Sequence, residues 1–175
     1  MEISIDAPRA AQEVGLAALL GGNLFGRVAM HPALRRVHDE RERGAVVNNA
    51  WRRYGKVNTL SLAAVVAGWA GERFGDGKPR DDTLARAKDV VVGAVALTGL
   101  AAAAEGVRFS RAWPDGAVPL ADGSTPADDT PRKAARQKRL LNALGFANLA
   151  AEMALAAINA ARPSRRRLPG RLARR

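Results

Sequence analysis

The sequence predicts an all-α fold: a four-helix transmembrane bundle with a short interfacial helical connector and a long irregular loop between helices 3 and 4. Four stretches rich in apolar and small residues recur along the 175-residue chain, and charged, Gly-rich or Pro-rich segments separate them. The chain is long enough for one domain. We expect that domain to cover residues 1–161, followed by a basic, disordered tail over 162–175.

The candidate spans cover residues 14–30, 57–70, 90–104 and 140–161. Only the last reaches the roughly 20 residues that cross a ~30 Å hydrocarbon core. The first three are expected to extend as helices to 10–30, 54–74 and 84–107. The third stretch has no charge and one hydroxyl, Thr98. A helix that is apolar on all sides must be buried completely or face lipid, which favours a membrane over water.

Small and aromatic residues in these stretches fit the same architecture. Gly22 and Gly26 have the small-xxx-small spacing that permits close approach of membrane helices. Tyr54, Trp69 and Trp113 stand near the ends of candidate spans, where aromatic rings favour the membrane interface. We therefore expect these three rings to mark the membrane boundaries.

The connecting segments differ in character. The charged segment 31–55 is expected to form a short helix-turn-helix on the membrane surface, and 71–80 a turn. Turn-forming residues fill 109–131, which predicts an extended, mobile loop. The run RKAARQKR then leads into the last helix, which Pro163 should end.

The first residues do not resemble a cleaved signal peptide, because Glu2 and Asp6 outweigh Arg9. The first apolar stretch should therefore remain in the mature protein. Lys and Arg are divided almost equally between the two sides of a four-span topology, so the positive-inside rule selects no orientation.

The formal net charge of +11 favours an anionic partner. Arginines of the tail are expected to bind lipid headgroups, namely Arg165, Arg166, Arg167 and Arg171. The tail lacks aromatic rings that could stack on bases, which disfavours nucleic acid. A soluble, basic helical bundle that binds nucleic acid stays open as an alternative, because the mean hydropathy is only −0.17.

Residues 21–62 contain a motif in which Pro32 and Ala33 follow a glycine-containing helix, and Trp51 and Tyr54 follow a charged segment. This pattern resembles the opening of small four-helix membrane proteins of the transmembrane protein 205-like kind. The segment KDVVVGAVALTGLAAAAEGVRFSR, followed by GAVPL, resembles uncharacterised actinobacterial membrane proteins. The resemblance implies a fold and a membrane location, and it carries no activity.

The last span holds polar residues at spacings of three and four, which place them on one helix face. They are Asn142, Asn148, Glu152 and Asn159. A carboxylate inside a span needs a partner. We expect Asn23 and Arg27 of the first helix to supply it, with Arg27 as the ion-pair partner.

This intramembrane polar site has two interpretations. One is a pocket for a proton, an ion or a small polar ligand. The other, which the mixed record of buried ion pairs favours, is a structural pair that fixes helix register.

Other chemistry has little support in the sequence. His31 and His38 are two helical turns apart, but Pro32 and the lack of further ligands disfavour metal or haem. No cysteine is present, no nucleotide or hydrolase motif occurs, and no serine has a base at a meaningful spacing, whether Ser110, Ser124 or Ser164. No cofactor or metal is therefore expected.

The function that the sequence favours is a non-enzymatic structural, accessory or permeation component of a bacterial inner membrane. A small membrane oxidoreductase with an intramembrane polar site is the alternative. The expected partners are membrane lipids, and other membrane proteins or a second copy of the chain are further candidates.

Overall fold

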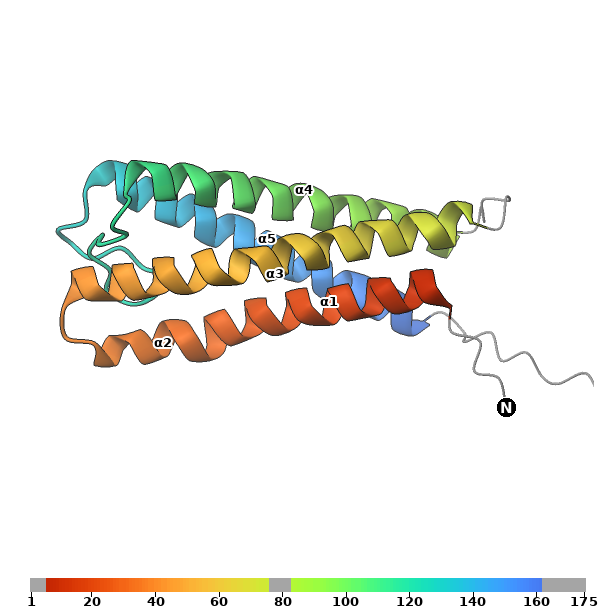
Figure 1. The fold of residues 1–175 in the computed structure, drawn as a ribbon, viewed down its shortest axis with the longest axis horizontal. Coiled ribbons are helices and arrows are strands. Elements are labelled where there is room, and N and C mark those ends of the chain that lie inside the picture. Colours follow the sequence, from red (N-terminus) through yellow and green to blue (C-terminus); the bar gives the residue numbers. More distant parts are fainter. Residues whose placement is uncertain (1–5, 76–82, 162–175) are drawn as a thin grey trace, which may run out of the picture.

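A computed structural model describes residues 6–75 and 83–161, and this part of the chain is all-helical apart from turns and one irregular loop. The long helices are α1 (Ala7–Phe25), α3 (Glu40–Phe74), α4 (Thr83–Ala112) and α5 (Arg132–Ala161). They form an elongated bundle in which α1 packs mainly on α3, and α4 mainly on α5 (Figure 1). The prediction of an all-α fold built from four main helices is confirmed, although the helices are longer than predicted.

The first helical rod extends past Phe25 because of the way it accommodates Pro32. A π-helical turn, Gly26–Met30, follows α1, and the short α2 (His31–Ala33) and a 3₁₀ turn, Leu34–Arg36, complete the rod. Proline has no amide hydrogen, and its ring collides with the carbonyl four residues earlier. The wider π turn just before Pro32 lets the rod continue.

Residues 31–55 form a helix, a turn and a helix, as predicted, but they are not a separate connector. Val37 adopts an extended backbone, and the Asp39 carboxylate then caps α3 by accepting hydrogen bonds from the amides of Arg41 and Glu42, at 2.7 and 3.2 Å. Residues 40–55 are the first half of α3. A strong N-cap with acidic residues in the first turn starts the helix there, and no residue interrupts it before Phe74.

The loop between α4 and α5 is irregular, as predicted, but it is anchored rather than mobile. The Leu120 amide donates to the Glu40 carbonyl at 3.0 Å, and the Arg43 guanidinium donates to the carbonyls of Leu120 and Ala121 at 3.1 and 2.9 Å. Val118 and Leu120 are buried. The loop therefore closes one end of the bundle over the turn between the first rod and α3 (Figure 1).

Glycines allow α1 and α3 to pack closely. A Cβ on Gly15 would lie 2.6 Å from the Ser61 carbonyl oxygen, so the two backbones approach where only glycine fits. Gly22 and Gly26 instead receive the rings of Tyr54 and Trp51. The Tyr54 hydroxyl donates to the Ala18 carbonyl at 2.8 Å, so this ring packs between α1 and α3.

Trp69 and Trp113 do lie near opposite ends of the bundle, on α3 and just after α4. The Trp69 indole donates to Asp89 at 2.7 Å, and the Trp113 indole donates to Gln137 at 3.2 Å. Both rings are anchored by polar partners at their ends of the bundle, which is compatible with the predicted interfacial position.

The main core is a cluster of aliphatic side chains shared by all four long helices: Leu16, Leu19, Val65, Val92, Val95 and Leu155. Outside this core, every long helix also exposes large apolar side chains. Val14, Leu60, Leu97 and Met153 are 70%, 72%, 71% and 57% exposed. By length and composition, two of the described helices, α4 and α5, could cross a membrane.

Candidate functional site

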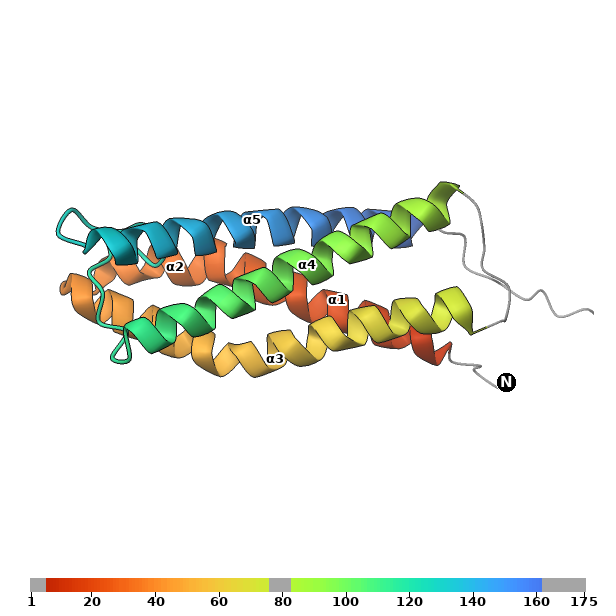
Figure 2. The same cartoon turned by 90° about the horizontal axis from the view of Figure 1, so that it is seen from above.

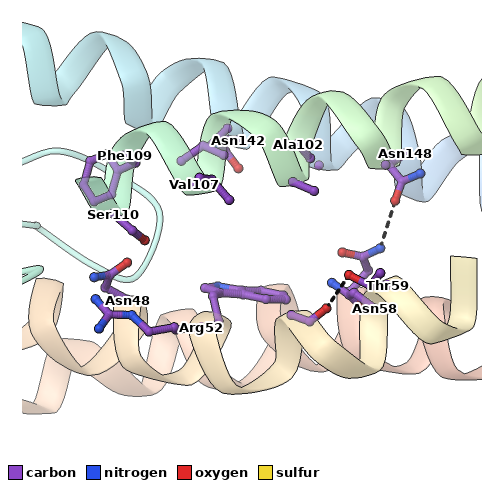
Figure 3. Close-up of a pocket in the computed structure, with 18 of the residues that line it drawn as sticks. Asn48, Arg52, Asn58, Thr59, Ala102, Val107, Phe109, Ser110, Asn142 and Asn148 are labelled. Atoms are coloured by element: carbon purple, nitrogen blue, oxygen red, sulfur yellow. Dashed lines mark hydrogen bonds between the residues drawn. The ribbon is translucent and has the colours of Figure 1, made fainter. Parts of the chain in front are cut away.

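Glu152 lies at the centre of a buried polar network. Its carboxylate is completely buried on α5, and both oxygens accept hydrogen bonds from Nδ2 of Asn23 on α1, at 2.9 and 3.0 Å. The same Nδ2 lies 3.5 Å from Oδ1 of Asn148 (Figure 3), and Asn148 donates to the Thr98 hydroxyl of α4 at 3.0 Å. The network therefore links α1, α4 and α5, and the expected contact of Asn23 with Glu152 is present.

The prediction that Arg27 pairs directly with Glu152 is wrong. Arg27 donates to the side-chain oxygen of Asn142 at 3.0 Å and to its carbonyl at 3.3 Å, and its guanidinium stacks 3.7 Å over the Phe146 ring. The two described residues form no ion pair with each other. Asn23 occupies the nearer position, one turn earlier on α1, so an amide takes the place of the expected cation.

Asn159 does not join this network. Its side chain is buried about two helical turns beyond Glu152 on α5. Its amide atoms have no hydrogen-bond partner within the described residues. Gln12 on α1 is completely buried in the same unpartnered condition, and the sequence reasoning did not single it out. Buried amides without hydrogen-bond partners are uncommon in proteins.

A cavity of about 1060 Å³ lies beside the Glu152 network, with α3 on one side and α4 and α5 on the other (Figure 3). Residues of α1 and α5 form its floor, among them Asn23, Arg27 and Asn142. Figure 2 shows α4 running obliquely across the bundle, and it contacts α3 only sparsely. The cavity exists because α3 and α4 do not pack along each other.

The exposed residues around the cavity show where it opens. Most of them lie on α3 and α4: Arg52, Lys56, Leu60, Leu100, Val107 and Arg111. The lining residues of α1 and α5 are buried or half-buried. The mouth of the cavity is therefore the gap between α3 and α4, on the side of the bundle.

The cavity lining is cationic. Lys and Arg side chains reach it from α3, α4, α5 and the π-helical turn after α1: Arg27, Arg52, Lys56, Arg111 and Lys138. No carboxylate lines it among the residues that the structure describes. Lys138 is the most deeply placed cation, only 9% exposed, and its ammonium group lies 4.6 Å from the centre of the Phe109 ring. Within residues 6–75 and 83–161 this ammonium has no hydrogen bond and no ion pair.

His31 borders the same cavity, and its environment keeps it neutral. Its Nε2 accepts a hydrogen bond from the Trp51 indole at 3.3 Å. Burial and the positive charge of Arg27 lower the pKa of His31 to about 4, against the opposing effect of Asp122. His38 lies in the turn after the helical rod, so the two histidines do not share a helix face. The described residues contain no cluster of three or more His, Cys, Asp or Glu that could hold a metal.

The serines and the tail arginines named from the sequence lie partly inside and partly outside the described residues. Ser110 and Ser124 line the cavity, and the Ser124 hydroxyl donates to Asp122 at 2.9 Å. Pro163 and Ser164 lie outside the described residues. The same holds for the predicted headgroup-binding arginines, Arg165, Arg166, Arg167 and Arg171.

Comparison of the chain with protein-family models, with curated proteins and with solved structures finds no significant match. The cavity, the polar network and the outer surface of the bundle are therefore the features that bear on function.

Proposed function

We propose that this chain is a multi-pass protein of a bacterial inner membrane that places all four long helices in the bilayer and takes up a ligand in its interior cavity. In this proposal it acts as a non-enzymatic accessory or permeation component. The observation that carries the proposal is the apolar outer surface, because large exposed apolar side chains occur on every long helix. A water-soluble monomer rarely exposes an apolar surface of this extent.

The distribution of charge supports the same location. Charged residues are absent from 14–26 in α1, 57–71 in α3 and 90–104 in α4, and Glu152 is the one charge within 140–161 of α5. The first three stretches are about 20–22 Å long at a rise of 1.5 Å per residue. This is shorter than a ~30 Å hydrocarbon core, so long basic side chains at their ends, such as Lys56, would extend to the interface.

The position of the cavity mouth supports ligand uptake from the bilayer. The mouth lies on the side of the bundle, between α3 and α4, and a lateral opening in a membrane-embedded bundle would face lipid. The loop over residues 113–131 covers the adjacent end of the bundle. The resemblance to proteins of the transmembrane protein 205-like kind implies a four-helix membrane fold, which is the setting that this uptake requires.

The proposal is tested by washing membranes from expressing cells with alkaline carbonate. Integral insertion predicts that the chain stays in the membrane pellet and is released only by detergent. Release into the wash would contradict the proposal and would favour the soluble, basic bundle. Salt-sensitive retention on DNA would then test that alternative, because counterion release makes nucleic-acid binding strongly salt-dependent.

A further inference from the structure

We propose that the cavity binds an anionic amphiphile with one apolar chain, whose carboxylate or phosphate head lies at Lys138 and Arg27 and whose chain extends along the mouth between α3 and α4. This inference rests on the proposed membrane function and names the class of ligand.

Lys138 is a buried cation without a counter-charge among the described residues. It is 9% exposed, and its ammonium contacts the face of the Phe109 ring as its one described partner group. Burial of a cation is costly unless a counter-charge compensates it. The cavity contains no such carboxylate among the described residues, so an anion from outside would supply the missing charge.

A second cation converges on the same place. Asn142 lies one turn after Lys138 on α5, so the two side chains share a helix face. Arg27 reaches that face from the π-helical turn that follows α1, and it donates to Asn142 at 3.0 Å. Its guanidinium has five N–H donors, and the two bonds to Asn142 leave others for an oxyanion. The Lys138 ammonium and the Arg27 guanidinium therefore lie at neighbouring turns of α5, along one wall of the cavity.

Polarity changes in a definite order along the mouth. Near the loop that closes the bundle, the mouth is lined by Arg52 and Arg111, and Arg52 donates to the Pro114 carbonyl at 3.2 Å. Towards the middle of the bundle it is lined by Leu60 and Leu100, which are 72% and 60% exposed. A lipid in one leaflet has the same order, with its charged head at the interface and its chain towards the midplane. The mouth is therefore complementary to an amphiphile and not to a small ion.

The size of the cavity agrees with one chain and a head. Its volume of about 1060 Å³ is at the upper end of the roughly 300–1,000 Å³ typical of small-molecule sites. Its inner end is lined by Leu19, Leu62 and Gly99, which offer apolar contacts to a chain.

The test measures binding of labelled probes that share a hexadecyl-length chain and differ in the head. The full chain is placed in nanodiscs of phosphatidylcholine, and empty nanodiscs give the background. The probes are hexadecanoate, hexadecyl phosphate, hexadecyltrimethylammonium and hexadecanol. At least one anionic probe should bind tenfold or more tightly than the cationic and neutral probes, and the stronger of the two anions identifies the head.

Variants of the basic residues at the start of α5 locate the binding. Lys138→Met removes the charge while keeping an unbranched side chain, and it should weaken anion binding tenfold or more. Lys138→Arg should retain most of it. Lys133→Met is the matched control, because Lys133 is exposed on the same helix and does not line the cavity. The helical content of each detergent-solubilised variant, measured by circular dichroism before reconstitution, shows whether the variant is folded.

The outcomes separate this inference from the proposed function. Equal binding of all heads would overturn the anionic ligand and leave a lipid-facing cavity. Full anion binding by folded Lys138→Met would overturn the placement of the head at Lys138. Binding of no probe by a chain that resists carbonate extraction would overturn the amphiphile and leave the membrane location. Release by carbonate would overturn the proposed function itself.

Discussion

Removal of the Asn23 side chain is expected to leave the Glu152 carboxylate without its hydrogen-bond donor. Glu152 is completely buried, and both of its oxygens depend on one amide, at 2.9 and 3.0 Å. A hydrogen bond to a charged group contributes about 1.5–3 kcal/mol, and loss of one partner of a buried pair costs about 3–5 kcal/mol. Because Glu152 can take up a proton instead, we expect Asn23→Ala to lower the free energy of unfolding by about 2–3 kcal/mol.

The control variants separate the network from general loss of packing. Glu152→Gln keeps an acceptor oxygen for Asn23, so it should cost about 1 kcal/mol or less. The double variant Asn23→Ala, Glu152→Gln should be more stable than Asn23→Ala alone. Asn49→Ala, which changes an exposed asparagine on α3, should have an effect within about 0.5 kcal/mol.

The assay is tryptophan fluorescence of detergent-solubilised protein during titration with a denaturing detergent. The four chains of the Asn23 and Glu152 cycle give a coupling energy, which should exceed about 1 kcal/mol. Additive effects of the two substitutions, within about 0.3–0.5 kcal/mol, would refute the idea that the amide compensates the buried charge.

Two further predictions use the same unfolding assay. A Cβ on Gly68 would lie 2.7 Å from a backbone nitrogen of α1, so Gly68→Ala should cost about 1–3 kcal/mol, whereas Gly21→Ala meets nothing within 4 Å and should gain up to about 1 kcal/mol; equal effects would contradict the close packing of α1 and α3. Burial and Arg27 lower the pKa of His31 from 6.5 to about 4, so between these pH values the unfolded chain binds a proton at His31 that the folded chain does not, and His31 therefore contributes a loss of stability as the pH falls. Partial burial acts to raise the pKa of Asp122, but hydrogen bonds lower it to about 2, so Asp122 stays charged in the folded chain over this window. The free energy of unfolding of His31→Gln relative to that of the wild type should rise as the pH falls from 6.5 to 4, and a constant difference would exclude this contribution of His31.

The sequence predicted the helical class and the position of each apolar stretch, because apolar composition identifies the part of a helix that avoids water. It underestimated how far the helices extend. Residues 40–55 belong to α3, and the basic run 132–139 forms the first turns of α5. Backbone hydrogen bonding continues through such charged residues, which are good helix formers, although hydropathy changes there. The loop between α4 and α5 was predicted to be mobile, but it is anchored. Glu40 and Arg43 of α3, which are distant from the loop in sequence, form hydrogen bonds with it.

The candidate site was only partly predictable. Spacing along α5 placed Asn148 and Glu152 on one face, and the need for a partner pointed to Asn23. The choice between Asn23 and Arg27 depends on the register of α1 against α5, which no periodicity within one helix determines. Lys138 was overlooked as part of a basic run. The spacing 138, 142, 145, 148 and 152 continues the same face by one turn, and this pattern could have identified it.

The cavity itself could not be predicted from local pattern. It depends on the sparse contact between α3 and α4, which follows from how two helical pairs cross. Glycines at the lining, such as Gly99 and Gly145, indicate close approach or open space equally well. Only the three-dimensional arrangement decides between them.

The central claim, that all four long helices lie in lipid, is tested most directly by cysteine accessibility in intact membranes. The chain has no cysteine, so each introduced thiol is the one reactive site. Ala17→Cys, Ala63→Cys, Ala101→Cys and Ala154→Cys place a thiol at an exposed position on α1, α3, α4 and α5, and Ala121→Cys is the exposed loop control. We expect a water-soluble maleimide to label position 121 and to leave the four helix positions unlabelled until detergent and denaturant are added. Labelling of all five positions at similar rates would contradict the membrane bundle, and labelling of positions 17 and 63 alone among the helix sites would reduce it to two spans, α4 and α5.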